Sequence, residues 1–213
     1  MSGRLATVAG AVLALFATAA PGAAPGSILD FRVELDGRPI GEHRFELRGE
    51  GDAQEVISRA EFSVRLLFVE LYRYRHTATE YWRNGCLESL ESRTDDNGRL
   101  EVVTASRRDR GLDVVANGSE GWLGGCVRSF AYWNPRILES SHLLNSQTGE
   151  YIPVRVDALG EERITVAGDT EPARRYRIVG KDIEIDLWYG RDQEWLALES
   201  HLQDGRRLRY ERS

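Results

Sequence analysis

The sequence predicts a mainly β protein: a single curved antiparallel sheet of about 9–11 strands, open or closed as a barrel, with one short helix as its plug or lid. Two observations lead to this prediction. Apolar and polar side chains alternate with a period of two over many short segments, and pairs of turn-forming residues separate these segments. The turn pairs are Asp36-Gly37, Asn84-Gly85, Asn97-Gly98, Asn117-Gly118 and Asp204-Gly205.

Residues 1–24 have the features of a secretory signal peptide, with cleavage near residues 19–24. Arg4 is the only charged residue in this segment, and an apolar run from Leu5 to Ala20 leads into prolines and small residues. The apolar run is about 16 residues long, whereas a membrane-spanning helix needs about 20. A retained membrane anchor is therefore the less favoured alternative.

The remaining chain, residues 27–213, is long enough to bury a core as one β-barrel-like domain. The full sequence carries a formal charge of −6, and removal of the signal peptide makes it more negative because Arg4 is lost without any acidic residue. This charge argues against a nucleic acid partner or an anionic membrane surface. Together with the signal peptide, it leads us to expect a periplasmic or secreted domain.

Period-two alternation marks the first and last strands most clearly. Apolar side chains recur at every second position in Phe31–Leu35 and again in Ile183–Tyr189, with charged residues between them. The stretch Val56–His76 also keeps one parity, but a single strand of this length would span about 70 Å. It must bend or break, and we place the bend around Arg65–Leu71, where both faces become apolar.

One segment has a helical pattern. Asn134 is a suitable N-cap, Pro135 suits the first helical position, and the apolar positions that follow recur at helical spacing. We expect a short helix from about Pro135 to Asn145. A helix inserted into an antiparallel sheet of this kind usually plugs or covers its concave side.

The sequence has two cysteines, Cys86 and Cys126. In an exported chain an isolated pair favours a disulfide, and two buried free thiols are the alternative. A bond that closes this loop would stabilise the fold by about 4 kcal/mol on the loop-entropy model.

The strongest functional signal is a row of large side chains at even-numbered positions between Glu70 and Trp82. If the strand is regular, its members share one face of the sheet, with apolar bodies and polar tips. Residues of the predicted helix entry could add an aromatic lip to this wall. The candidate ligand-binding residues are Phe68, Glu70, Tyr72, Tyr74, His76, Trp82, Tyr132 and Trp133.

This wall has three interpretations. It could contact a ligand, or His76 and Glu80, four residues apart on one face, could form the acid–base pair of a cell-envelope enzyme. The third interpretation is cross-strand aromatic packing, with His76 and Glu80 hydrogen-bonded at a wet edge.

The pattern indicates neither a metal nor a cofactor. The four histidines, at positions 43, 76, 142 and 201, have no metal-ligand spacing. There is also no nucleophile elbow, phosphate loop or dinucleotide fingerprint.

Several segments are similar to a bacterial exported family catalogued as a domain of unknown function (number 6134), and this similarity covers most of the chain after the signal peptide. The final hairpin also resembles that of the open-barrel carriers that move lipoproteins between bacterial membranes. These resemblances imply a curved antiparallel sheet wrapped around a helix, with an apolar cavity, and carry over no catalytic residues. The segments are Tyr72-x-Tyr74-x-His76, Glu80-x-Trp82, Ser92-x-Thr94-x-x-Asn97-Gly98, Tyr132-Trp133-Asn134, Leu144-Asn145-x-x-Thr148-Gly149 and Ile185-x-Leu187-Trp188-Tyr189.

The sequence therefore favours a periplasmic binding or carrier protein for an apolar or amphipathic, lipid-like small molecule held in the concave face of the sheet. The first alternative is the envelope enzyme that uses His76 with Glu80. The second is a non-catalytic docking protein of an envelope complex, with another envelope protein as its partner.

Overall fold

The structure is a computed structural model that describes residues 26–66 and 69–213. Within these residues, fourteen strands form one antiparallel sheet in the order β8-β7-β6-β5-β4-β3-β2-β1-β14-β13-β12-β11-β10-β9. The strands are β1 (Ile28–Leu35), β2 (Arg38–Glu50), β3 (Ala53–Leu66), β4 (Val69–Arg83), β5 (Cys86–Asp96), β6 (Arg99–Arg108), β7 (Gly111–Ala116), β8 (Ser119–Gly124), β9 (His142–Leu144), β10 (Tyr151–Val166), β11 (Asp169–Gly180), β12 (Ile183–Tyr189), β13 (Trp195–His201) and β14 (Arg207–Arg212).

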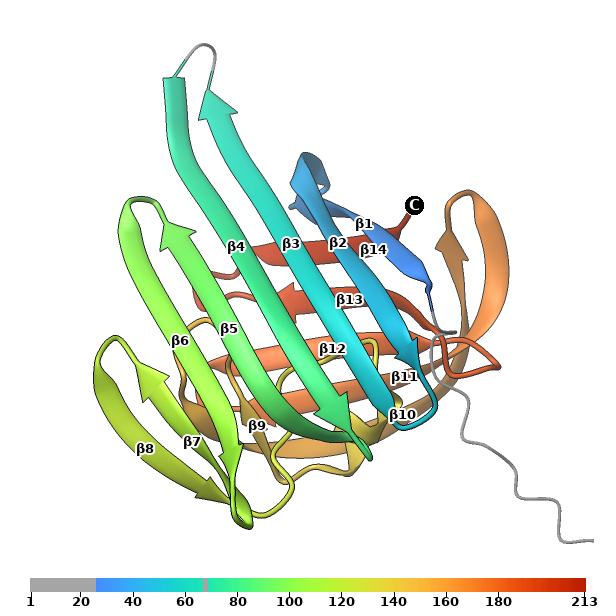
Figure 1. Cartoon of the computed structure of the whole chain (residues 1–213). Coiled ribbons are helices and arrows are strands. Elements are labelled where there is room, and N and C mark those ends of the chain that lie inside the picture. Colours follow the sequence, from blue (N-terminus) through green and yellow to red (C-terminus); the bar gives the residue numbers. More distant parts are fainter. Residues whose placement is uncertain (1–25, 67–68) are drawn as a thin grey trace, which may run out of the picture.

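The sheet bends into two layers that face each other (Figure 1). Strands β2–β8 form the front layer of that view, and β9–β14 form the layer behind it, with strands that run across those in front. β1 joins the layers because it pairs with β2 on one side and with β14 on the other. The end strands β8 and β9 do not pair with each other, so the predicted curved sheet is an open barrel.

The strand number exceeds the predicted 9–11 because several hairpins turn without an Asn-Gly or Asp-Gly pair. The pairs at 36–37, 84–85, 97–98 and 117–118 do form the expected left-handed turns, with positive φ at both residues. The same backbone conformation occurs at Asp109, Ala167 and Asp182, with φ of 52°, 50° and 59°. The prediction of 9–11 strands did not count these three turns, so it treated the two strands on either side of each turn as one.

The main hydrophobic core fills the space between the layers. Phe31 of β1 and Trp195 of β13 lie at its centre, each 1% exposed, with ring centroids 4.0 Å apart. The alternation of β1 and β12 accounts for this core, because their apolar positions point inward and their charged positions point outward. The core therefore depends on strands that are far apart in the sequence.

The predicted bend between Val56 and His76 is confirmed. β3 ends at Leu66 and β4 begins at Val69, and their hairpin projects beyond the rest of the sheet (Figure 1). Phe68, one of the candidate ligand-binding residues, lies outside the described residues. The proposed signal peptide at 1–24 also lies outside them.

The predicted helix begins where expected and ends early. A 3-10 helix, η1, spans Pro135–Glu139, and the side chain of Asn134 accepts a hydrogen bond from the backbone N–H of Arg136. The prediction of a helix that continues to Asn145 is wrong, since His142–Leu144 forms β9, which pairs with β10. Backbone pairing with the next strand along the chain outweighs the helical spacing of the apolar residues here.

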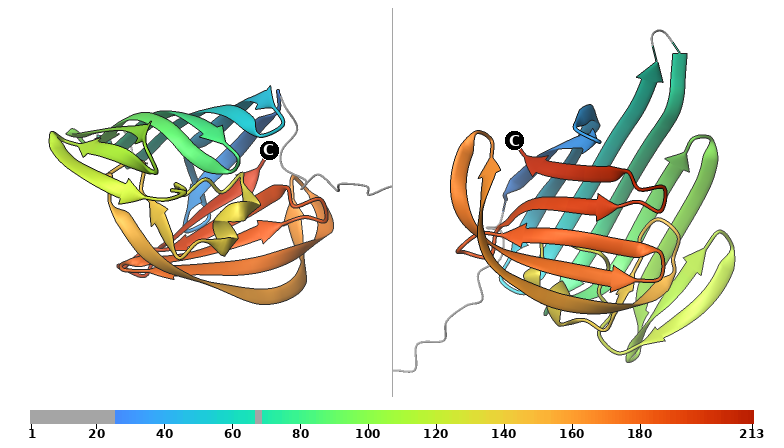
Figure 2. Two further views of the ribbon diagram at one scale, coloured as in Figure 1. Left: turned by 60° about the horizontal axis from the view of Figure 1, so that its bottom comes forward. Right: turned by 180° about the vertical axis from the view of Figure 1, so that it is seen from behind.

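The segment between β8 and β10 lies between the two layers, as the left view of Figure 2 shows. The predicted disulfide ties its beginning to the front layer, because Cys86 at the start of β5 is bonded to Cys126. Arg128 adds a hydrogen bond from its Nε to the backbone oxygen of Gly85, at 3.0 Å. We call residues 125–150 the plug segment.

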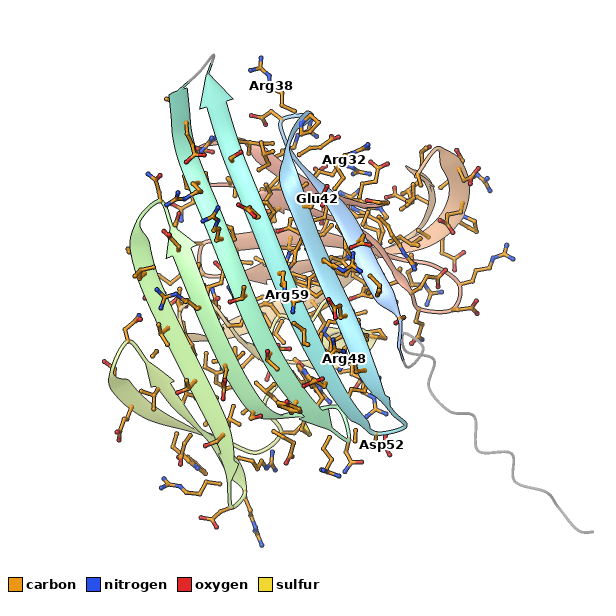
Figure 3. All side chains as sticks on the ribbon, turned by 45° about the horizontal axis from the view of Figure 1, so that its top comes forward. Arg32, Arg38, Glu42, Arg48, Asp52 and Arg59 are labelled. Carbon is orange, nitrogen blue, oxygen red and sulfur yellow. A yellow bond between two sulfur atoms is a disulfide. The ribbon has the colours of Figure 1, made fainter. Side chains whose placement is uncertain are left out.

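Charged side chains cover the outer face of the front layer (Figure 3). Glu46 of β2 accepts hydrogen bonds from Arg48 at 2.8 Å and from Arg59 of β3 at 2.7 Å, and these arginines lower its pKa.

Among the described residues, none of the helices is long and apolar enough to cross a membrane.

Candidate functional site

A cavity of about 260 Å³ lies between the two layers, next to the plug segment. We call it the inner cavity. Both layers and the plug segment contribute to its wall, so it forms only when the sheet has closed over itself. Its lining residues are His43, Phe45, Ser58, Tyr74, His76, Ala78, Glu80, Phe130, Tyr132, Asn145, Ser146, Gln147, Ile183, Ile185, Leu198, Ser200, Leu208 and Tyr210.

Small side chains on β3 and β4 account for the hollow. The sheet register places Ser58 opposite Ala78, and Ala60 one row away, so the inner face of the front layer has few large groups here. Because protein interiors are otherwise close-packed, such a patch leaves space unless a partner layer fills it. The opposite layer contributes branched side chains from β12 to β14, and these line the space without filling it.

Two histidines flank this patch in one cross-strand row. His43 of β2 lies opposite Ala60 of β3, and Ala60 lies opposite His76 of β4. Nε2 of His43 is 2.7 Å from the hydroxyl of Ser58, and Nδ1 of His76 is 2.9 Å from the hydroxyl of Thr94.

Both imidazoles are neutral at physiological pH. Burial lowers the pKa of His76 to about 4. Burial, followed by the nearby His76, lowers the pKa of His43 to about 3. The Nδ1 atom of His43 is inaccessible and has no hydrogen-bond partner among the described residues. A buried nitrogen without a partner costs about 1–3 kcal/mol, so this one needs an explanation.

Glu80 lies deeper, on the same face of β4. Its carboxyl group accepts hydrogen bonds from the indole N–H of Trp82 at 3.0 Å and from the hydroxyl of Ser129 at 2.8 Å. Burial raises its pKa, and these two hydrogen bonds oppose that effect. Both oxygens are thus occupied, and neither contacts His76 in the described structure.

Three tyrosines from separate elements meet at the cavity: Tyr74 of β4, Tyr132 of the plug segment and Tyr210 of β14. Burial is the main reason that the pKa of each hydroxyl is raised. Neighbouring tyrosines, Tyr72 among them, also raise the pKa of Tyr74 and of Tyr210.

The plug segment is held over the cavity by hydrogen bonds from the sheet. The hydroxyl of Tyr189 on β12 donates to the backbone oxygen of Tyr132 at 2.7 Å. The hydroxyl of Ser92 on β5 donates to the backbone oxygen of Ser146 at 2.5 Å. These contacts position the Phe130–Tyr132 and Asn145–Gln147 parts of the lining.

The candidate residues from the sequence separate into three groups. Tyr74, His76 and Tyr132 line the inner cavity, as does Glu80, and half-buried Tyr72 packs beside Tyr74. Trp82 and Trp133 are buried in the core with ring centroids 5.4 Å apart.

The third group is Glu70, which is exposed near the β3–β4 turn, away from the cavity lining.

Sequence reasoning missed the back wall from β12 to β14 and the polar loop Asn145–Gln147, because no local pattern indicates that they meet β4. The sequence gives only a weak indication that His43 faces the cavity: it lies two residues before Phe45 and therefore on the same face of the strand.

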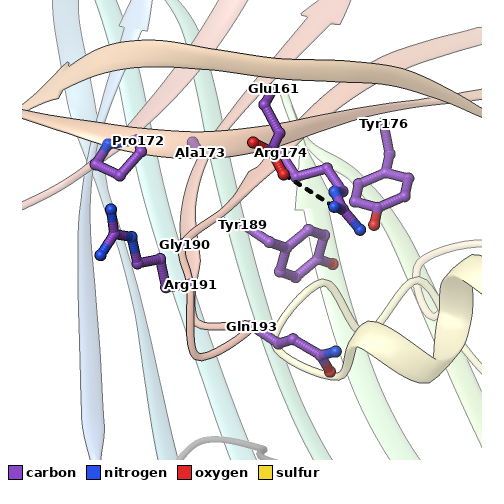
Figure 4. Close-up of a pocket in the computed structure, with 9 residues that line it drawn as sticks. All are labelled: Glu161, Pro172, Ala173, Arg174, Tyr176, Tyr189, Gly190, Arg191 and Gln193. Atoms are coloured by element: carbon purple, nitrogen blue, oxygen red, sulfur yellow. Dashed lines mark hydrogen bonds and ion pairs between the residues drawn. The ribbon is translucent and has the colours of Figure 1, made fainter.

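A second hollow, of about 300 Å³, lies at the rim of the back layer (Figure 4). It is formed by β10 and β11 together with the turn Gly190–Gln193. Of its charged lining residues, Arg174 and Glu161 are exposed and paired with each other at 2.9 Å. Solvent-exposed ion pairs of this kind contribute little, so this rim pocket is a weaker candidate for a site.

Groups of three or more His, Cys, Asp or Glu side chains placed to hold a metal ion do not occur within residues 26–66 and 69–213. What the inner cavity offers instead is neutral hydrogen-bonding groups from the front layer, the plug segment and β14, beside apolar side chains of β12 and β13. This arrangement suits an amphipathic molecule.

Comparisons with known proteins agree with this fold. The family model described as domain of unknown function (DUF6134) matches residues 31–213. A search of the curated proteins found no match. A crystal structure of a β-barrel-like protein of domain of unknown function DUF1849 from Brucella abortus is similar, with a TM-score of 0.66 and 10% sequence identity. That match covers 87% of this chain and 94% of the other, and at such identity it shows the fold alone.

Proposed function

The chain belongs to the family described as domain of unknown function (DUF6134), and we propose that it binds a small amphipathic molecule in the inner cavity. One observation carries this proposal. The cavity is lined by polar groups that the protein leaves partly without partners, and by apolar side chains opposite them.

The polar wall supports binding because its composition is costly for a purely structural core. Cross-strand packing needs no histidine at either end of a row of small residues, and the unpaired Nδ1 atom of His43 destabilises the empty protein. That atom is inaccessible from the cavity, so the ligand would contact the accessible polar groups of the lining, among them the tyrosine hydroxyls.

The size of the cavity limits the ligand. A volume of 260 Å³ is just below the usual range for ligand pockets, about 300–1,000 Å³. Because a water molecule occupies about 30 Å³ in the liquid, the space holds on the order of ten non-hydrogen atoms. The buried part of the ligand is therefore a short chain or a single ring system.

The geometry favours binding over catalysis by His76 with Glu80. A general acid–base pair needs its two groups within hydrogen-bonding reach of one another or of a shared proton. His76 is bonded to Thr94, whereas both oxygens of Glu80 are bonded elsewhere.

The docking alternative also has less support. The large apolar side chains that are exposed lie on five different strands and do not define one docking patch by themselves. They are Ile28, Leu71, Tyr81, Leu100, Val102, Trp122 and Leu159.

We further propose that the protein acts in the periplasm or outside the cell. The Cys86–Cys126 disulfide supports this location, because such bonds persist in oxidising compartments. Cleavage of residues 1–24 stays a prediction, which N-terminal sequencing of protein recovered from the periplasm can test.

The test of binding is native mass spectrometry on protein secreted into a bacterial periplasm. We expect wild-type protein to carry a small molecule and Ala78→Leu to carry much less, because the added side chain enters the cavity. Thr77→Leu is the matched control, since Thr77 is the neighbouring residue and its side chain is exposed on the outer face. Absence of any bound molecule from wild-type protein, or equal occupancy in Ala78→Leu, would contradict the proposal.

A further inference from the structure

We propose that the ligand is an uncharged amphiphile whose polar end carries an acceptor oxygen, and that the hydroxyls of Tyr74, Tyr132 and Tyr210 recognise it. This inference rests on the function proposed above and defines the chemical class of the ligand.

The first argument is the absence of a usable charge. The lining contains neither arginine nor lysine, so a carboxylate or phosphate would enter the cavity without a counter-charge. Burying an unpaired ion costs far more than burying a neutral polar group. Glu80 is the only acidic group of the lining, and its two oxygens already accept hydrogen bonds, which leaves it poorly placed to bind a cation.

The second argument is the set of unused donors. Within the described chain, the hydroxyls of Tyr74, Tyr132 and Tyr210 have no hydrogen-bond partner, whereas the hydroxyl of Tyr189 is bonded to the plug segment. Their oxygen atoms are also accessible, whereas the Nδ1 atom of His43 is enclosed by its neighbours. They therefore border open space. Each phenol is a good donor because its proton is retained at neutral pH, and burial raises its pKa further.

The third argument is the shape of the apolar wall. Ile183 and Ile185 on β12 and Leu198 on β13 face the polar front layer across the cavity. A molecule that fills the space would contact these side chains along its length and present its oxygen to the tyrosines. A ligand with one short apolar portion and one neutral acceptor group satisfies both walls.

Isothermal titration calorimetry at pH 7.5 with three matched probes tests this inference. 2-Nonanone and octanoate carry the same alkyl chain on a carbonyl carbon, and the ketone has a methyl group where octanoate has its charged oxygen. Octylammonium supplies the opposite charge. We expect 2-nonanone to bind at least about tenfold more tightly than either ion, because only the ions must be buried unpaired. Equal or tighter binding of octanoate or octylammonium would overturn the inference while leaving a binding function in place. If none of the three binds, the inference and the proposed function both fail.

Tyrosine variants then test the recognition itself. Tyr74→Phe, Tyr132→Phe and Tyr210→Phe each remove one donor and keep the ring, so each should weaken 2-nonanone binding by about threefold to tenfold. Tyr151→Phe is the control, because Tyr151 packs against His142 of β9 outside the cavity lining. Unchanged affinity in all three variants would show that the tyrosines do not recognise the ligand, even if the preference for the neutral probe holds.

Discussion

The two faces of the back layer bury polar groups in opposite ways. On the outer face, Asp186 of β12 is fully buried and accepts hydrogen bonds from Arg175 at 2.5 Å and from Arg177 at 2.7 Å and 2.8 Å. On the inner face, the neighbouring Ile185 lines a cavity whose polar groups are neutral and partly unpaired. The same strand therefore borders a charged cluster, in which both oxygens of Asp186 accept hydrogen bonds although Nε of Arg175 has no partner among the described residues, and a neutral hollow with partly unpaired polar groups.

This difference distinguishes a structural cluster from the binding site that we propose. Asp186, Arg175 and Arg177, which we call the outer ion-pair cluster, have their strongest interactions with one another, and Trp188 and Arg209 pack beside them. The carboxylate of Asp186 is satisfied within the fold and needs no ligand. The inner cavity keeps donors without acceptors, which is the condition that a binding site requires.

The largest effect expected of a substitution at neutral pH is that of losing the outer carboxylate. Asp186→Ala leaves two partly exposed arginines without their buried partner, and we expect the free energy of unfolding to fall by about 3 kcal/mol. Urea denaturation provides the measurement. Glu184→Ala is the control, because Glu184 lies two residues earlier on the same face and is 43% exposed, so its loss should cost less than about 1 kcal/mol. Equal effects of the two variants would remove the distinction between the faces.

The pH dependence of stability separates the regions next. The two cavity histidines bind protons below pH 6.5 in the unfolded chain but only near pH 4 and pH 3 in the folded one. Their contribution to stability is complete above pH 6.5 and is lost as the pH falls toward 4 for His76 and toward 3 for His43, at up to about 1.4 kcal/mol per pH unit for each histidine. We expect His43→Phe with His76→Phe to flatten this part of the profile, measured by urea denaturation at several pH values.

Asp186 affects a different pH range. Burial alone raises its pKa, but the hydrogen bonds from Arg177 and Arg175 outweigh burial and lower the pKa to about 2. Its stabilising contribution is present above pH 3.8 and is lost as the pH falls through 2. A wild-type profile that stays flat between pH 6.5 and 4 would contradict the neutral state that we assign to the cavity histidines.

The smallest effect on stability is expected from the cavity itself. His43→Phe combined with Ser58→Ala removes an unpaired nitrogen and the one hydrogen bond between these side chains. The two changes offset each other, so thermal unfolding should show a stability within about 1 kcal/mol of wild type, or slightly above it. Destabilisation as large as that of Asp186→Ala would show that the inner polar wall is structural.

Local sequence pattern predicted the elements well, because it reports on forces that act locally. Period-two alternation marked β1 and β12, and the Asn-Gly and Asp-Gly pairs marked four hairpins. The stretch Arg65–Leu71, where both faces become apolar, marked the break between β3 and β4. The disulfide followed from the number of cysteines and the expected compartment.

The site was predicted only on one wall. Tyr74 and His76 share a strand, so their parity placed them on one face, and Tyr132 followed as a lip. Tyr210 lies more than 130 residues after Tyr74 and reaches the cavity only because β14 pairs with β1 and closes the sheet. Long-range register of this kind leaves no local signature. β9 was mistaken for the end of a helix for a different reason, because three residues are too few to show alternation and their apolar positions also fit helical spacing.

A crystal structure of the protein soaked with 2-nonanone tests the central claim most directly. Our account predicts one molecule in the inner cavity, with its carbonyl oxygen within hydrogen-bonding distance of the hydroxyl of Tyr74, Tyr132 or Tyr210 and its chain against Ile185 and Leu198. A molecule bound only at the rim pocket or on the outer face, with the inner cavity filled by ordered water alone, would contradict it.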